Sequence, residues 1–517
     1  MSAIAILTPR LSSQAKALFY TTRIAPKTAR CFTTSAAPKQ GENVAIVGGG
    51  AAGFYTAARL LTKPGDFNVD IFEQLPTPHG LVRYGVAPDH PEVKNCMNKF
   101  DEVASNARVR FFGNVRVGSN GSLSLDSLRS LYDSVVLSYG ASKDRHLGIP
   151  GENGNGGDRF GVLSARQFVA WYNGLPEAQD LKPDLFSFDK IVIVGQGNVA
   201  LDCARILLTD PDELAKTDIT AQALEVLRKS KIRHVEMVGR RGPLQVAFTA
   251  KELREMTKIP GVRIVSDTDF ISSECTHGAA FLANSRPLKR MMDLLLKHAV
   301  PPTNISAIAS AEKTFEISFL KSPTQVLFNQ KWGDSGEEVP QLLRFQVNKL
   351  EGLPDAAKAL PTDKFVDIPC AMALRSIGYA STPIDGAPFD SKRKIVPNIA
   401  GRVVNGDNEP VPGLYVAGWL KRGPIGVIAT TMQDAYRTAD AVAMDINNGN
   451  CQLRQTSRKD IDDELSKLGV DKVKVANGDW KRLEEYEFKQ GKKAGKPREK
   501  VPSIGKMLSV IRSTDAH

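Results

Sequence analysis

The chain has 517 residues, of which 42% are hydrophobic, and its 68 Lys and Arg residues against 57 Asp and Glu residues give a formal net charge of +11. Because single domains have roughly 100 to 200 residues, this length indicates two to four domains, and the composition excludes a disordered chain and a small disulfide scaffold. A charge of this size would ordinarily suggest nucleic acid or an anionic membrane as a partner.

The excess positive charge lies at the two ends of the chain. Residues 1–41 contain six basic residues and no acidic residue, and residues 452–517 contain 16 basic and 11 acidic residues. The body between them, residues 42–451, holds 46 residues of each sign and is formally neutral. It also lacks the interleaved basic and aromatic residues of nucleic-acid-binding proteins, so we expect no nucleic-acid partner.

Residues 1–40 are rich in Arg, Ser, Thr and Ala, with apolar residues between the basic ones. This composition predicts a mitochondrial transit peptide, with Arg30-Cys31-Phe32 as a processing site; a disordered basic tail is the alternative. No run reaches the roughly 18 apolar residues of a membrane span, so we expect a soluble or membrane-peripheral protein. The six cysteines are widely separated and form no Cys-x-x-Cys, which argues against a local dithiol centre and predicts no metal site.

A short apolar run at residues 42–47 ends in a glycine turn with Gly48, Gly50 and Gly53, followed by a helical stretch to about residue 61. This order predicts the strand, turn and helix of a dinucleotide-binding unit, whose helix N-terminus holds the pyrophosphate. Glu73 ends the next predicted strand, where a carboxylate can accept hydrogen bonds from a ribose. The alternative is an ordinary glycine turn and a surface glutamate.

A second unit of the same kind begins at residues 190–194, and its turn holds Gly195 and Gly197 before a helical stretch to residue 208. Its second strand ends at Arg240 and Arg241 and carries no acid. Two guanidinium groups can bind a 2′-phosphate that a carboxylate would repel, so this unit is predicted to prefer the phosphorylated nicotinamide cofactor. A solvated arginine pair is the alternative.

Two further apolar strands, residues 134–138 and 413–417, fit an arrangement in which the second unit is inserted in the first. The later strand is followed by Gly418-Trp419 and a glycine-containing loop at 422–428, and a helix starting near Ala429 could direct its amides at an anion or a flavin edge.

Four long motifs, at residues 80–91, 195–202, 238–256 and 418–428, resemble the mitochondrial NADPH:adrenodoxin (ferredoxin) oxidoreductases. The resemblance runs from about residue 42 to the C-terminus. It implies an α/β fold of two interleaved Rossmann-like domains, as in glutathione-reductase-like flavoproteins. It further implies FAD and NADPH as cofactors and an acidic [2Fe–2S] ferredoxin as partner, which would serve monooxygenases or iron–sulfur cluster or haem biosynthesis. We expect a monomer in the mitochondrial matrix, with peripheral attachment to the inner membrane left open.

The domains that follow are FAD-binding at 41–145 and 366–517, with a polar, partly helical surface tail from about 452, and NADP-binding at 146–365. Matched motif by motif, the FAD contacts are expected to be Gly48, Gly50, Ala52, Gly53, Glu73, Leu81, Val117, Trp419, Gly426, Val427 and Ile428. The NADP contacts are expected to be Gln196, Gly197, Asn198, Val199, Arg240, Arg241, Glu252 and Gly426. His79 stands where the family has an aromatic residue, and the turn reads GGGAAG where GSGPAG is usual, so the FAD pocket is expected to be retuned but kept.

The flavin would carry the chemistry, so no protein nucleophile is needed. His90 and Asp202 are the candidates for a polar pair near the nucleotides that orients them or supplies a proton; a purely structural role is the alternative. Because the ferredoxins are acidic, a local basic face is also expected. Residues at spacings of three, four and seven supply one on a predicted helix: Arg286, Lys289, Arg290 and Lys297. An ordinary solvated helix face is its alternative.

Three other readings stay open at this point. A flavin monooxygenase would keep both nucleotide units and oxygenate a substrate. An amidotransferase-linked flavoprotein, such as the small subunit of glutamate synthase, normally carries cysteine-rich iron–sulfur segments, which are absent here. A non-catalytic nucleotide-binding redox sensor would keep both glycine turns without needing the late loop.

Overall fold

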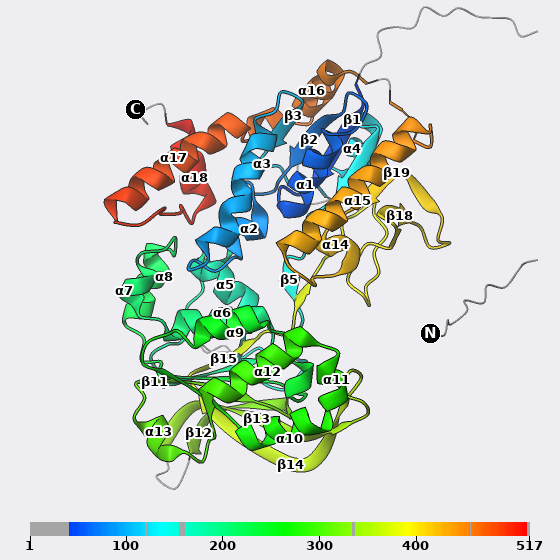
Figure 1. The fold of residues 1–517 in the computed structure, drawn as a ribbon. Coiled ribbons are helices and arrows are strands. Elements are labelled where there is room, and N and C mark those ends of the chain that lie inside the picture. Colours follow the sequence, from blue (N-terminus) through cyan, green and yellow to red (C-terminus); the bar gives the residue numbers. More distant parts are fainter. Residues whose placement is uncertain are drawn as a thin grey trace, which may run out of the picture. The chain divides into compact units, whose positions relative to one another are not determined.

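The computed structural model describes residues 41–118, 121, 123–154, 161–332, 337–451, 453–454 and 456–513. The predicted transit peptide therefore lies outside the described residues. The fold is built on two seven-stranded sheets, and elements from both ends of the chain, blue and orange in Figure 1, meet in the first of them.

The first sheet contains the strand that leads into the first glycine turn, and this strand is buried along its whole length. Its spatial order is β17 (Asn398–Ile399), β18 (Arg402–Val404), β19 (Pro410–Val416), β4 (Ser134–Leu137), β1 (Asn43–Val47), β2 (Asn68–Phe72) and β3 (Val109–Phe112). The five strands from β19 to β3 are parallel. Helices α1 (Ala51–Leu60), α3 (Cys96–Ala104) and α15 (Ile428–Asn447) cover one face, and α4 (Leu125–Leu131), α14 (Trp419–Arg422) and α16 (Arg458–Lys467) pack on the other. A parallel sheet must be buried on both faces, which this layering achieves.

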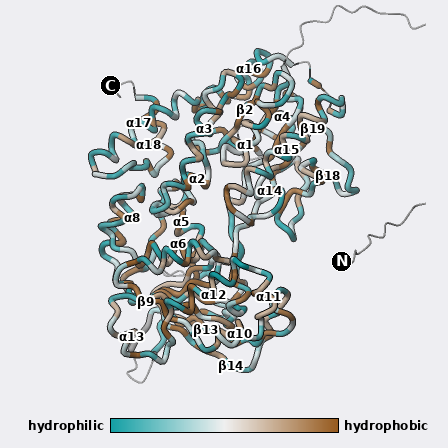
Figure 2. The backbone as a smooth tube through the Cα atoms, in the orientation of Figure 1, coloured by the Kyte–Doolittle hydropathy of each residue, from teal (hydrophilic) through white to brown (hydrophobic). Residues whose placement is uncertain are grey.

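The second sheet is parallel throughout. Its order is β10 (Ala299–Val300), β9 (Val262–Ser266), β11 (Lys313–Ser318), β8 (His234–Val238), β7 (Lys190–Val194), β15 (Met372–Arg375) and β6 (Val162–Ser164). Helices α5 (Ala165–Tyr172), α6 (Asn198–Leu208), α8 (Ala221–Arg228), α9 (Ala250–Met256) and α12 (Arg286–His298) contribute to the core on one face. The hydrophobic, brown stretches of Figure 2 follow the strands of this sheet and the helices on it. The predicted α/β fold with two interleaved dinucleotide-binding units is confirmed.

The other face of the second sheet packs on an antiparallel sheet of three long strands, β12 (Lys321–Trp332), β13 (Glu337–Glu351) and β14 (Lys358–Cys370). The predicted boundary at 365/366 falls inside β14. The chain leaves the second sheet only after β15, because Met372 to Arg375 pair with both β7 and β6. Residues 366–375 thus lie with the inserted part, in contrast to the prediction. The two crossings between the parts, β5 (Lys143–Asp144) and β16 (Tyr379–Ala380), pair antiparallel.

The residues predicted as a polar surface tail fold into α16, α17 (Asn477–Lys493) and α18 (Ile504–Arg512). Their helical character was expected, but their burial was not. Trp480 and Leu483 are fully buried in a separate hydrophobic cluster, and Glu487 is fully buried against Arg83. The many charged residues suggested a solvated tail because the sequence does not show that partners such as Arg83, far away along the chain, pair with them. None of the described helices has both the length and the apolar character of a membrane span.

Candidate active site

The two glycine turns lie at the carboxyl ends of β1 and β7, where each parallel sheet changes the direction of its strand order. Such switch points are where open α/β sheets bind ligands. Gly48 has φ of 112° and Gly195 has φ of 121°, a region that side chains disfavour. A Cβ on Gly53 would lie 2.1 Å from the carbonyl oxygen of Gly48, so only glycine lets α1 approach β1 this closely.

The middle glycine of each turn faces open space. A Cβ placed on Gly50 or Gly197 would meet no atom within 4 Å. The helices that follow, α1 and α6, have no side-chain cap, whereas Ser164 caps α5 and Thr220 caps α8. The first amides of α1 and α6 are therefore free of side-chain acceptors, and the turns have the room and the donors that a pyrophosphate requires.

Glu73 closes the first site at the end of β2. Its Oε2 accepts a hydrogen bond from the amide of Gly49 at 2.8 Å, and its Oε1 accepts one from the amide of Leu75 at 3.1 Å. Burial raises the pKa of Glu73 above its ordinary value, and these amides oppose the shift. A pocket beside it is also lined by Gly48, Val117 and Ile384. Ile384 escaped the sequence analysis because it lies in a segment without strand or helix periodicity.

The segment after His79 packs directly on the first turn. The amide of His79 donates to the carbonyl of Gly49 at 2.7 Å, and a Cβ on Gly80 would lie 3.2 Å from the Cα of Gly50. This places Leu81, in α2 (Gly80–Tyr84), next to the turn. The His79 ring lies among the rings of Phe54, Phe100 and Trp480, so it packs in an aromatic environment.

The late loop is held at the N-terminus of α15. Arg422 donates to Thr431 Oγ1 at 2.9 Å, and the amide of Gly418, at φ of 72°, donates to Asp434 Oδ2 at 2.7 Å. Trp419 is half-buried against Tyr379, with ring centroids 5.3 Å apart. The loop from 424 to 427 is turned outward, and Val427 is 57% exposed although it is apolar. The remaining predicted residues of this loop, Gly426 and Ile428, lie beside it at the start of α15.

The second turn is braced by its own side chains. Gln196 donates to the carbonyl of Ser318 at 2.9 Å, and Asn198 accepts a hydrogen bond from the amide of Thr249 at 2.9 Å. Arg240 and Arg241 follow β8 and are exposed, and within the described ranges neither guanidinium has a recorded ion pair. Two adjacent cations that form no ion pair with another described residue are well suited to bind an anionic group.

His90, Asp202 and Glu252 come together although they are far apart in sequence, with their ligand-type atoms all within 4.8 Å of one another. His90 Nε2 lies 3.6 Å from Glu252 Oε2, and Arg205 Nη2 binds Asp202 Oδ1 at 2.7 Å. Burial raises the pKa of Asp202, against the attraction of Arg205. Arg205 also pairs with Asp89 and so supplies the positive charge that the carboxylates need.

The sequence analysis missed Arg205 and Asp89 as part of this cluster. The spacing of three between Asp202 and Arg205 on one helix could have indicated the first of them. Asp89 lies inside a recognised motif but has no neighbour in sequence that reveals its partner.

A family model described as pyridine nucleotide-disulphide oxidoreductase matches residues 42–270. The mitochondrial NADPH:adrenodoxin oxidoreductase of Homo sapiens is 47% identical over 90% of this chain and 91% of its own, and that of Salvelinus fontinalis is 45% identical over 93% and 94%. The structure of Mycobacterium tuberculosis FprA in complex with NADPH matches with a TM-score of 0.81 and 36% identity, covering 92% of this chain and all of that one. The chain belongs to the NADPH:adrenodoxin oxidoreductase family.

Membership confirms the resemblance inferred from the four motifs and makes the chain an oxidoreductase of the pyridine-nucleotide class. The described cysteines are free thiols, so the disulphide in the name of the family model has no counterpart among them. The relatives are named mitochondrial, which agrees with the composition of residues 1–40.

The predicted basic face lies on α12. One side of this helix is buried through Met291, Met292 and Leu295. The residues predicted for the basic face are all exposed: Arg286, Lys289, Arg290 and Lys297. Lys289 pairs with Asp293 at 2.9 Å. No ion pair within the described ranges is recorded for the other three, so this family member carries a positive helix surface on its second unit.

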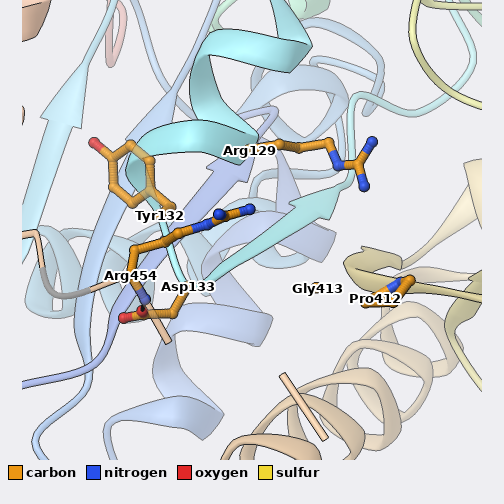
Figure 3. Close-up of a pocket in the computed structure, with 6 residues that line it drawn as sticks. All are labelled: Arg129, Tyr132, Asp133, Pro412, Gly413 and Arg454. Carbon is orange, nitrogen blue, oxygen red and sulfur yellow. Dashed lines mark hydrogen bonds between the residues drawn. The ribbon is translucent and has the colours of Figure 1, made fainter. Parts of the chain in front are cut away.

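A further pocket, drawn in Figure 3, is lined by Arg129, Tyr132, Asp133, Pro412, Gly413 and Arg454. It lies near the start of β4, at the amino ends of the parallel strands, whereas the glycine turn lies at their carboxyl ends. The carboxylate of Asp133 accepts there from the amides of Asn43 and Arg454, and neither glycine turn lines this pocket. We therefore do not assign this pocket to nucleotide binding in the oxidoreductase.

Proposed function

We propose that this protein takes a hydride from NADPH onto FAD and passes the electrons one at a time to an acidic [2Fe–2S] ferredoxin. The observation that carries the proposal is the pair of glycine turns with room at Gly50 and Gly197, one followed by a buried acid and the other by two exposed arginines. When bound, FAD supplies the conversion between two-electron and one-electron transfer. The chain's own residues bind and orient the cofactors.

The first turn and Glu73 would hold the pyrophosphate and ribose of FAD, and Ala52, Leu81, Val117 and Trp419 would line its pocket. The open space at Gly50, the uncapped start of α1 and the ribose-binding position of Glu73 all fit this cofactor. The exposed loop with Gly426, Val427 and Ile428 would cover the flavin side, which explains why apolar side chains face outward there.

The second turn, Gln196 to Val199, would hold the pyrophosphate of NADPH, and Arg240 and Arg241 its 2′-phosphate. His90 and Glu252, whose side chains lie 3.6 Å apart, would orient the nicotinamide, and Asp202 would hold a proton because burial raises its pKa. Glu252 Oε2 lies 3.6 Å from the guanidinium of Arg205, which would hold the Glu252 side chain in place.

The ferredoxin would dock on the basic face of α12. Reversing two charges, Arg286→Glu and Arg290→Glu, should raise the KM for ferredoxin about tenfold or more, because complementary charges steer and hold such complexes. NADPH-dependent reduction of ferricyanide, which needs no protein partner, should not change. Both rates are measured by steady-state kinetics at several salt concentrations, and the effect should shrink as salt screens the charges.

The matched control is Lys229→Glu, another exposed basic residue of the same unit, in α8's C-terminal turn. It should leave both reactions near the wild-type rates. An equal loss of ferredoxin and ferricyanide reduction in the α12 variant would place the defect in the cofactor sites and overturn this docking face.

The decisive test of the function is NADPH-dependent cytochrome c reduction by the purified yellow protein, with and without a [2Fe–2S] ferredoxin. Strict dependence on ferredoxin is expected. NADPH-dependent peroxide or substrate oxygenation without ferredoxin transfer would indicate a monooxygenase, and a colourless protein would indicate a non-catalytic nucleotide sensor.

We propose that the protein acts as a monomer in the mitochondrial matrix; the relatives' names and the N-terminal composition support a mitochondrial location. Sedimentation of the purified protein tests the monomer, and fractionation of mitochondria into matrix and membranes tests the location. Release from the membranes by salt would identify peripheral attachment.

A further inference from the structure

Residues 89–94, here called the bridging segment, belong to the first unit but contact the second at both of their ends. Asp89 pairs with Arg205, and His90 faces Glu252 at 3.6 Å. At the other end, in the turn of 3-10 helix Pro91–Asn95, Lys94 Nζ binds both oxygens of Asp218 at 2.7 and 2.8 Å. The same short segment therefore carries a candidate site residue at one end and a buried ion pair at the other.

Asp218 receives a second ammonium group from the C-terminal part of the chain. Lys500 Nζ lies 3.0 Å from Asp218 Oδ2 and donates to Asn173 Oδ1 at 3.2 Å, and its side chain is fully buried. Residues 496–501, here called the C-terminal strap, also bind the neighbouring backbone. Lys496 donates to the carbonyl of Ile219 at 2.6 Å, and Glu499 accepts from the amide of Ala221 at 3.1 Å.

The other side of the C-terminal strap is tied to the first unit. The amide of Val501 donates to Glu487 at 2.9 Å, and Glu487 binds Arg83 of α2 at 2.6 Å, with Arg83 1% exposed. Since α2 packs on the first glycine turn through Gly80, the strap joins that turn to Asp218 of the second unit. Lys94, Asp218 and Lys500 thus come from three separate stretches of chain, and they meet where the bridging segment and the C-terminal strap contact the second unit.

The charges around Asp218 explain why it is the residue that holds Lys94 and Lys500 together. Burial alone would raise its pKa, but Lys500 and Lys94 hold the pKa below its ordinary value, so the carboxylate stays ionised. Burial lowers the pKa of Lys500 to about 7, against the attraction of Asp218, so the buried group carries little excess positive charge. Removing the carboxylate would leave the buried amino groups of Lys94 and Lys500 without the acceptor that holds them together, which loosens a structure much more than losing an exposed pair.

We propose that Asp218 is a positioning residue for hydride transfer: by binding Lys94 and Lys500 together, it fixes the bridging segment, and with it His90, against the second unit. The inference rests on the proposed function, because it assumes that the nicotinamide and the flavin meet between the two units. A displacement of about 1 Å at a reacting centre can lower a rate by about 100-fold. By holding Lys94 and Lys500, Asp218 can therefore control the chemical step without binding either cofactor.

The test is Asp218→Asn, studied as the FAD-containing protein. Three quantities are measured: the rate constant for flavin reduction by saturating NADPH in anaerobic stopped flow, the Kd of NADP⁺ by calorimetry, and amide hydrogen exchange in residues 89–94 and 496–501. We expect the rate constant to fall about tenfold or more, the Kd to stay within about twofold because both glycine turns and the arginine pair are intact, and exchange to rise in both segments. The matched control Asp212→Asn, which breaks only the exposed pair with Arg228, should change none of the three.

An unchanged rate constant would reduce Asp218 to a structural role, and a parallel loss of NADP⁺ affinity would show that it acts on the binding site; either result overturns the proposal. If Asp218→Asn does not yield a folded protein, Lys500→Met is measured instead and judged by the same criteria. This substitution keeps the approximate length of the side chain and removes its amino group. A wild-type flavin that NADPH does not reduce would refute the proposed function instead. The exchange measurement would still report whether Asp218 couples the two segments.

Discussion

A Gly50→Val protein should fold normally and be purified without FAD. The backbone at Gly50 has φ of −89° and ψ of −169°, which any residue adopts, and a Cβ there meets no protein atom within 4 Å. The valine side chain would instead fill the space that the pyrophosphate needs and block the amides of α1. Losing two or three charge-assisted hydrogen bonds should weaken FAD binding by about 100-fold or more.

Flavin absorbance per protein and a titration with added FAD measure this loss, and circular dichroism checks the fold. Two variants sharpen the interpretation. Gly406→Val, at another glycine with no neighbour within 4 Å, should stay yellow. Gly197→Val should also stay yellow, yet its flavin should no longer be reduced by NADPH, because only the second turn is filled. A Gly50→Val protein that keeps its full FAD content would contradict the assignment of the first turn.

The double variant Arg240→Ala/Arg241→Ala should lose most of its preference for NADPH over NADH. Each guanidinium can contribute roughly 1.5 to 3 kcal/mol through charge-assisted hydrogen bonds to a phosphate, so kcat/KM for NADPH should fall about 100- to 10,000-fold. The value for NADH should change little, because NADH lacks the 2′-phosphate. The fold should tolerate the change, since both side chains are exposed and no described residue is recorded in an ion pair with them.

The ratio of the two kcat/KM values, measured with ferricyanide as acceptor, is the readout for this pair of arginines. Arg228→Ala, which removes an exposed arginine from α8, is the matched control and should keep the wild-type ratio. A wild-type enzyme that used NADH as well as NADPH, or a double variant with an unchanged ratio, would remove the arginine pair from the cofactor site.

Local sequence patterns were enough to predict the two nucleotide-binding units, because a strand, a glycine turn and a helix are set by neighbouring residues. Gly48, Gly53 and Gly195 are needed for backbone reasons that the spacing alone already indicates. The family motifs added the expected contacts at Leu81 and Trp419, which no periodicity would have suggested.

Long-range pairings were out of reach of the sequence. The strand β15 lies far from its partners β6 and β7 along the chain, so the return to the first unit was placed about ten residues too early. The C-terminal helices were misjudged for a related reason. A residue such as Glu487 reads as solvated until its partner Arg83, 404 residues away in sequence, is known.

The pairing of β5 with β16 has a consequence for how such a protein can be taken apart. Because the chain enters and leaves the second unit through two strands joined by ladder hydrogen bonds, with the amide of Arg145 also donating to the carbonyl of Gly378 at 3.2 Å, the two ends of the inserted part are immediate neighbours. Closely spaced ends are what lets a domain be inserted or exchanged without disturbing its host. The two junctions are therefore the adjacent points at which another nucleotide-binding domain would be grafted, and such a graft would have to reproduce the contacts of the second unit with residues 89–94 and 496–501.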